Sequence, residues 1–299
     1  MQKGAGINFI RNGVVVGKIT WRTTYAGEGT KGSRVVRLTT GMDQFKFTGE
    51  TGPSDLSVTW TTGGYNDGTN SNKPCGVSGS GPRDVAQWVA GGTAIYTISS
   101  AKTDGYSRDY ISRCGIAHWF TVRGTSETLN GGTGVRFDSA SYLGSNGAGI
   151  FDRVVPIMQE YATSSTRNGA VARHVQLAQT NPNATYPPLP DGSAKLIPGS
   201  IASGRTLNRL MSTWDTAVAN RYADNRNTVR ATCANLPHQD GEECDEYPFA
   251  STWEGAGSGP MFSVKYVDGT QNGNAGTDLN NWYVADRTLH FDKFYVHIS

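Results

Sequence analysis

The hydrophobic pattern of the chain changes in kind near Pro156, and this change limits the possible folds more than any other feature. Before it, short runs of Val, Ile, Thr and aromatic residues alternate with turns of Gly, Asn and Pro. These runs lie at 13–21, 34–38, 56–60, 94–98 and 116–122. Such runs predict β-strands. Because they are short and regularly spaced, residues 1–155 are expected to form an antiparallel, β-sandwich-like domain.

Residues 156–299 mix two patterns, because apolar residues at helical spacing alternate with β-branched and aromatic runs. The predicted elements are helices at 169–179 and 206–225, an irregular proline-rich connection at 181–200, and strands at 261–267 and 294–298. The chain is therefore predicted to be α+β overall, with a β-rich domain at 1–155 and a small α+β domain at 156–299.

Composition agrees with a secreted protein and with no membrane span. The 299 residues include 38 Gly and 17% charged residues, and no apolar run reaches the length of a transmembrane helix. The net charge of +2 hides an asymmetry. Residues 1–155 carry 16 Lys and Arg against 11 Asp and Glu, whereas 156–299 carry 11 against 14. Ordinary solvated surface explains this asymmetry, and a weakly basic first half that helps to hold a polyanion is the alternative.

Four cysteines occur without the spacing of a zinc site. An even count in a chain of this composition predicts two disulfides, Cys75–Cys114 and Cys233–Cys244, and four free thiols are the alternative. The second pairing would close a short loop that runs into a dense group of acids and ends immediately before Asp245. A secreted protein also needs a leader, so we expect either its removal or a longer parent chain.

That group holds five acids within seven residues: Asp240, Glu242, Glu243, Asp245 and Glu246. Carboxylates this close raise one another's pKa and repel unless a positive charge lies among them. Hard divalent cations bind such oxygens. Successive residues of an extended segment point to opposite faces. We therefore expect one of Asp245 and Glu246 to point into a site, without deciding which.

The segment CDEYPFASTWEGA, which begins at Cys244 and includes the last two of these acids, resembles the signature of the NucA/NucB family of secreted bacterial deoxyribonucleases. GAVARHVQLAQ, FSVKYV, QNGNAGTDLNNWY and FDKFYVHI occur in the order seen in that family. VRFDSASYLGSNGAGIF at 135–151 is similar to a segment that precedes the nuclease domain in longer actinobacterial relatives. The resemblance implies an actinobacterial-type nuclease domain with an N-terminal β-rich extension.

The resemblance also implies roles for particular residues. Asp245, Glu246 and Glu254 are expected to hold a divalent metal ion, Mg²⁺ or Mn²⁺, and to act in catalysis. His174 is expected to be the general base, against the alternative of a core histidine. After Pro248, Glu254 is expected in a short helix that ends near Gly255.

Substrate contacts are expected from three further residues. Arg226 and Arg230 can bind a phosphate in a bidentate manner, against the alternative of solvated arginines. Asn272 lies where the family has an Asn between Asp and Arg. Here Gln271 and Gly273 replace those two neighbours, which weakens the contribution of this predicted loop.

Two tryptophans bear on the same site. Trp253 and Trp282 are either core residues or platforms on which unpaired bases stack.

The sequence therefore predicts a secreted, divalent-metal-dependent, sequence-nonspecific endodeoxyribonuclease that acts on DNA as a monomer. An inhibitor or immunity protein is a further expected partner. One alternative is a catalytically decayed protein that binds a glycan or a cell surface. Another is the nuclease toxin end of a longer delivered chain.

Overall fold

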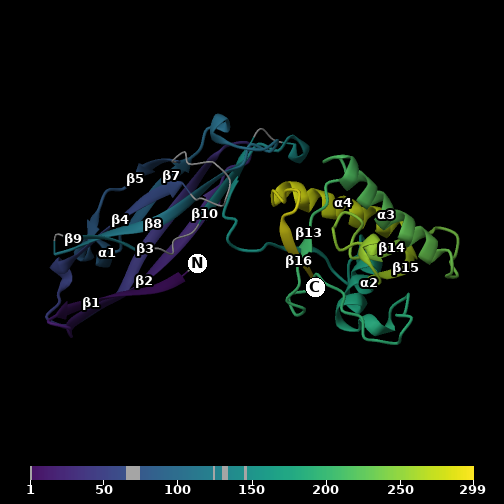
Figure 1. Ribbon diagram of the computed structural model, residues 1–299, viewed down its shortest axis with the longest axis horizontal. Coiled ribbons are helices and arrows are strands. Elements are labelled where there is room, and N and C mark those ends of the chain that lie inside the picture. Colours follow the sequence, from purple (N-terminus) through teal and green to yellow (C-terminus); the bar gives the residue numbers. More distant parts are fainter. Residues whose placement is uncertain (1, 65–74, 124, 130–133, 145–146) are drawn as a thin grey trace. The chain divides into compact units, whose positions relative to one another are not determined.

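The computed structural model describes residues 2–64, 75–123, 125–129, 134–144 and 147–299. The chain folds into two compact units, Met1–Val154 and Val155–Ser299. The first is built of β-strands, and the second combines helices with short strands (Figure 1). This arrangement confirms the predicted α+β class. Within the described residues, none of the helices is both long enough and apolar enough to cross a membrane.

The first unit contains two antiparallel sheets. Its elements are β1 (Gln2–Arg11), β2 (Val14–Gly29), β3 (Val35–Gly49), β4 (Leu56–Gly64), β5 (Gly76–Gly79), β6 (Arg83–Asp84), α1 (Val85–Val89), β7 (Thr93–Ser99), β8 (Ser112–Val122), β9 (Thr125–Leu129), β10 (Gly134–Asp138) and β11 (Ala148–Ile150). One sheet has the order β1-β2-β3-β7-β5, and the other has β11-β10-β8-β4-β6 with β9 paired to β8.

A single hydrophobic core joins the two sheets of this unit. Ile19 and Leu38 reach it from the first sheet, and Leu56 and Phe137 reach it from the second. The disulfide between Cys75 and Cys114 adds a covalent link, because Cys75 immediately precedes β5 and Cys114 lies in β8. Two sheets that share one core form the layered arrangement expected from the strand pattern.

The second unit contains three longer helices and five strands. Its elements are β12 (Ile157–Tyr161), α2 (Gly169–Thr180), β13 (Leu207–Asn208), α3 (Thr216–Cys233), β14 (Glu242–Tyr247), β15 (Ser263–Asp268), α4 (Gly269–Ala285) and β16 (Lys293–Ile298). Strand β16 pairs in parallel with β12 and antiparallel with β13, and β14 pairs with β15 in a separate hairpin.

The β14–β15 hairpin lies between two hydrophobic cores. On one face, Tyr247 and Val267 join the core formed with α2 and α4. On the other face, Val264 packs with Val229 and Cys233 of α3. Alternate residues of β14 are therefore directed toward different helices, as the two-residue period of a strand requires.

The predicted helix at 206–225 is wrong at both ends. Leu207 is fully buried, but it lies in β13 opposite Phe294. Helix α3 begins only at Thr216, because the Asp215 side chain accepts a hydrogen bond from the backbone N–H of Val218 at 2.8 Å and caps its first turn. The buried residues before this cap belong to an extended segment.

Two expectations about the acidic motif and its surroundings are also wrong. Glu254 lies in a turn, and the 3-10 helix Ala256–Ser258 begins after Gly255, so no helix ends there. Residues 271–273 lie in the first turns of α4, a helix that the sequence analysis did not predict. Asp268 caps α4 by accepting from the N–H of Gln271 at 2.9 Å.

Candidate active site

Strand β14 carries two of the acids assigned to the site, and the structure separates their side chains. Asp245 is directed toward α2, where it meets His174. Glu246 lies on the opposite face, where the charge of Arg226 on α3 reaches it. The acids are adjacent in sequence, but they contact different helices.

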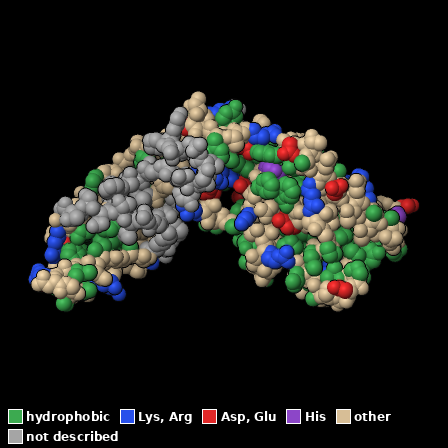
Figure 2. Space-filling view, in the orientation of Figure 1, with side chains coloured by type: hydrophobic (Ala, Val, Ile, Leu, Met, Phe, Trp, Pro, Cys, Tyr) green, Lys and Arg blue, Asp and Glu red, His purple; other side chains and the backbone are tan. Residues whose placement is uncertain are grey.

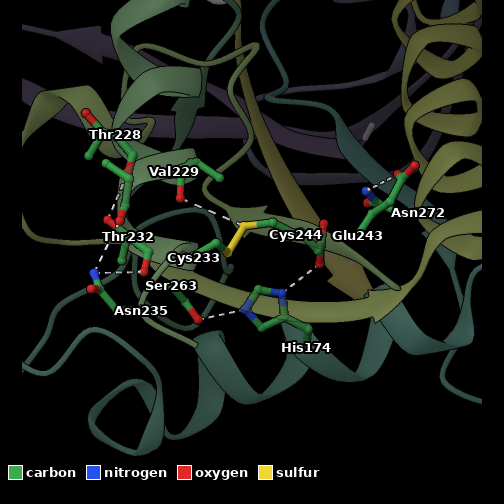
Figure 3. Close-up of a disulfide and its surroundings, with 12 residues drawn as sticks. His174, Thr228, Val229, Thr232, Cys233, Asn235, Glu243, Cys244, Ser263 and Asn272 are labelled. Carbon is green, nitrogen blue, oxygen red and sulfur yellow. Dashed lines mark hydrogen bonds and ion pairs between the residues drawn. A yellow bond between two sulfur atoms is a disulfide. The ribbon is translucent and has the colours of Figure 1, made fainter. Parts of the chain in front are cut away.

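Asp245, His174 and Ser263 form a buried hydrogen-bonded chain. The His174 Nδ1 atom lies 2.6 Å from Asp245 Oδ2. Its Nε2 atom lies 2.7 Å from the Ser263 hydroxyl, as Figure 3 shows. The three residues are 1%, 5% and 0% exposed in the order His174, Asp245, Ser263. An ionised carboxylate can only accept, so Nδ1 donates to Asp245, and in the neutral ring Nε2 accepts from Ser263. Both ring nitrogens of His174 are thus engaged away from solvent.

Glu246 has a different environment, because its side chain is only partly buried. Its Oε1 atom accepts a hydrogen bond from the N–H of Ala250 at 3.2 Å. Burial, followed by the negative charge of Asp245, raises the pKa of Glu246 to about 7, and the Ala250 N–H and Arg226 oppose this increase. Glu246 is therefore a carboxyl that changes its charge near neutral pH.

Glu254 is held by a different strand. Its Oε2 atom accepts the backbone N–H of Asn208, in β13, at 2.8 Å. Burial raises its pKa, and this hydrogen bond opposes the increase. The carboxyl is partly buried. Glu254 thus joins the end of the acidic motif to β13.

Asn225 of α3 fixes the turn that carries Glu254. It is fully buried, and its side-chain amide donates to the carbonyls of Ala250 and Thr252 at 2.9 and 3.0 Å. Its Oδ1 atom accepts from the N–H of Gly257 at 3.0 Å. A Cβ atom at Gly255 would overlap this amide, which explains why glycine follows Glu254.

The disulfide Cys233–Cys244 joins the end of α3 to β14 (Figure 3). Cys244 immediately precedes Asp245, so the bond fixes the start of the acidic segment against α3. Both predicted disulfides are therefore present in the structure.

The three residues assigned to substrate contacts lie in two places. Arg226 and Arg230 are exposed on α3 and are one helical turn apart. Asn272 lies on α4, where its Nδ2 atom donates to Glu243 at 3.1 Å (Figure 3). Its neighbour Gln271 accepts the N–H of Ala170 at 2.7 Å and so satisfies the start of α2. Gln271 thus joins the first turns of α4 to the start of α2.

The two tryptophans also differ. Trp282 is a core residue that contacts Tyr283 and Phe294. Trp253 is partly exposed and stacks on Phe291.

The predicted metal ligands do not meet at one point. Among the residues that the structure describes, no three His, Cys, Asp or Glu side chains are placed to hold a metal ion together. Asp245 binds His174, and Glu254 binds the backbone of β13. Glu246 and Glu254 are each partly exposed, and the charges of Arg226 on Glu246 and of Arg221 and Arg205 on Glu254 favour their ionised forms. The donor set fits an ion held by one carboxylate, and it does not fit a three-carboxylate cage.

Three residues that build this site, Ser263, Asn225 and Asn208, are not predicted from the sequence. Ser263 and Asn225 gave no signal, because their partners are distant in the sequence: Ser263 lies 89 residues from His174, and Asn225 contacts residues 25 to 32 positions away. Asn208 was placed inside a predicted helix.

Residues 202–297 match the family model described as Deoxyribonuclease NucA/NucB. The match includes β14, Asp245, Glu246 and Glu254, and it begins after α2 and His174. Neither a curated protein nor a solved structure matches the chain. Residues 202–297 are a domain of the deoxyribonuclease NucA/NucB family, and this domain indicates deoxyribonuclease activity.

Proposed function

We propose that the chain is a secreted, divalent-metal-dependent endodeoxyribonuclease without sequence preference, and that its chemistry depends on Glu246. The observation that carries this proposal is the partly buried Glu246 carboxyl on the α3 face of β14, where the positive charge of the exposed Arg226 acts on it. Arginine binds phosphate oxygens in a bidentate manner. Contacts to backbone phosphates carry no sequence information, which is the basis for nonspecific cleavage.

Glu246 is the carboxylate that fits a divalent ion. Mg²⁺ is commonly held by one or two carboxylates together with water and substrate phosphates. A divalent ion there would supply charge neutralisation on the phosphate and lower the pKa of an attacking water. The negative charge of Glu246 is disfavoured by burial and by Asp245, so a cation beside it would stabilise the ionised form.

Asp245, His174 and Ser263 support this site from the other face of β14. Because both His174 nitrogens are engaged and the ring is 1% exposed, the proposal gives His174 a positioning role. Its hydrogen bond orients Asp245, whose charge acts on Glu246. Glu254 and Asn225 hold the turn that follows the strand.

Secretion is supported by the two disulfides, which persist in oxidising compartments. The monomeric state and an inhibitor or immunity protein remain expectations of the sequence. Size-exclusion chromatography with light scattering measures the first, and purification from the native secretion medium tests the second.

Plasmid digestion tests the proposal. The wild-type protein is incubated with supercoiled DNA in Mg²⁺, Mn²⁺ or EDTA, beside an RNA substrate. We expect nicked and then linear DNA with either metal and intact DNA in EDTA. Glu246→Gln should lower the rate by about 100-fold or more, since it removes the charge that holds the ion. The matched control is Glu160→Gln, which removes an exposed carboxylate from the same unit.

Two outcomes would contradict the proposal. If the wild-type protein leaves DNA intact with every metal while a control nuclease digests it, the decayed binding protein is the better reading. If Glu246→Gln cleaves as fast as Glu160→Gln, the chemistry lies elsewhere in the unit. His174→Ala, tested for folding by circular dichroism, then decides whether the histidine is the catalytic base.

A further inference from the structure

An aromatic stack with one exposed ring lies beside Glu254, at the end of the acidic motif. Trp253 and Phe291 are nearly parallel, with ring centroids 4.7 Å apart and an interplanar angle of 7°. Trp253 directly precedes Glu254. Phe291 is 55% exposed, whereas Trp253 is partly buried. One face of the Phe291 ring is covered by Trp253, and a large part of the ring remains open to solvent.

The backbone around Phe291 is held in an unfavourable conformation. Its φ is +70°, a region that a bulky L-residue rarely adopts. A turn fixes it there, because Asp292 donates its N–H to Leu289 O at 3.0 Å and its carboxylate accepts the N–H of Leu289 at 2.6 Å. Strained residues of this kind concentrate at ligand sites. Glycine or asparagine would suit this turn better, so the ring is displayed at a cost in stability.

The stack is tied to Glu254 through β13. Asn208 donates its N–H to Glu254 Oε2 at 2.8 Å, and its carbonyl accepts the N–H of Trp253 at 2.9 Å. The next residue, Arg209, accepts the N–H of Phe291 at 2.9 Å. The aromatic rings and the carboxyl are thus fixed to one short strand.

Electrostatics give DNA a limited attraction to this unit. Residues 156–299 carry 11 Lys and Arg against 14 Asp and Glu. On the face shown in Figure 2, basic and acidic side chains are interspersed with hydrophobic ones over this unit. A net-negative unit that binds DNA needs contacts other than charge, and stacking of bases on aromatic rings is one that tolerates any sequence.

We propose that the Trp253–Phe291 stack binds an unstacked nucleobase of the DNA substrate. The base would lie on the exposed part of the Phe291 ring and extend the existing stack. Bases of a duplex are already stacked on their neighbours, so this contact favours single-stranded or locally opened DNA. This inference rests on the proposed nuclease function and adds the class of substrate.

Phe291→Gly tests the inference with little risk to the fold. It removes the ring, and glycine adopts positive φ without strain. We expect the KM for a single-stranded oligonucleotide to rise about five-fold or more. A change of about five-fold corresponds to the smallest effect expected when one base loses its aromatic stacking partner. The rate on duplex plasmid should change little, so the preference for single strands falls. Phe291→Tyr should keep the wild-type preference for single-stranded DNA, because the aromatic face is retained.

Leu196→Ala is the matched control, since Leu196 is an exposed apolar residue of the same unit at 63% exposure. A second readout uses a single-stranded oligonucleotide containing 2-aminopurine, in EDTA, whose fluorescence is quenched when the base stacks. Wild type and Phe291→Tyr should quench it, and Phe291→Gly should not.

Failure of this inference is distinguishable from failure of the proposed function. If wild type cleaves DNA but Phe291→Gly and Leu196→Ala show the same ratio of single-strand to duplex activity, the aromatic stack does not bind bases. Light scattering gives a second outcome that would overturn the inference. If wild type is a dimer and Phe291→Gly is a monomer, the ring covers a second copy of the chain and not a base. If wild type cleaves no DNA, the proposed function itself fails.

Discussion

Replacing Glu246 by glutamine should stabilise the metal-free protein, and the gain should depend on pH. In the folded state the pKa of Glu246 is about 7, whereas its ordinary value is 4.5. Between these values the folded protein keeps a proton that the unfolded chain has lost. The unfolded state then binds fewer protons, so stability falls as pH rises through this window. One pKa unit corresponds to about 1.4 kcal/mol, and the full loss is therefore about 3 kcal/mol above pH 7.

Glutamine retains the acceptor oxygen for the Ala250 N–H and carries no charge at any pH. The unfolding free energy of Glu246→Gln minus that of wild type should therefore increase by about 3 kcal/mol between pH 4.5 and pH 8. Urea unfolding in EDTA, followed by circular dichroism at 222 nm, measures it. This signal reports mainly the second unit, which contains the three longer helices.

Glu160→Gln again serves as the control for the loss of one negative charge from this unit. If the unfolding free energies of the two variants differ from that of wild type by the same amount at every pH, burial and the charge of Asp245 do not raise the pKa of Glu246. A stabilising effect that decreases toward pH 8 would refute the argument outright, because its sign would be reversed.

Three further changes test the scaffold of the site by the same unfolding assay. Ser263→Ala should cost about 2 kcal/mol, because it leaves a buried imidazole nitrogen unpaired, and the exposed Ser164→Ala should cost less than about 0.5 kcal/mol. Asn225→Ala breaks three hydrogen bonds, two of them buried, and should cost about 3 kcal/mol while lowering kcat for DNA cleavage. Replacing Cys233 and Cys244 by serine should cost about 3 kcal/mol, the value for closing a loop of this length, and a change below 1 kcal/mol would show that the bond does not constrain the unfolded chain.

Local patterns in the sequence were sufficient for the strand-rich first unit and for α2. In α2 the buried residues Val171, Val175 and Ala178 repeat at helical spacing, and nothing competes with that pattern. Helix α4 carries a comparable pattern in Ala275, Leu279 and Trp282. Its glycines and asparagines have low helix propensity, so the segment resembles a loop until tertiary packing is considered.

The arrangement of the acids could not be derived from the sequence. Which of Asp245 and Glu246 faces which helix depends on the register of β14 against β15, where Asp245 lies opposite Lys265 and Glu246 opposite Val264. That register, and the positions of α2 and α3 around the hairpin, are set by contacts between distant residues. The composition of the chain and the spacing of its residues do not reveal these long-range contacts.

Asp245 and Glu246 are neighbours in the sequence, but the strand that carries them passes between two hydrophobic cores, so their side chains face different cores. Asp245 is bound inward by His174, so its removal should act first on the stability of the hairpin. Glu246 is directed toward the opposite, partly exposed face, where its charge opposes folding, and in the proposed function this charge holds the metal ion. Replacement of the two neighbouring acids should therefore change stability in opposite directions. Loss of the Asp245 carboxylate should destabilise the unit, whereas neutralising Glu246 should stabilise it and prevent DNA cleavage. A site of three equivalent metal ligands would predict that neutralising either acid relieves the same repulsion, and this difference in sign separates the two descriptions of the motif.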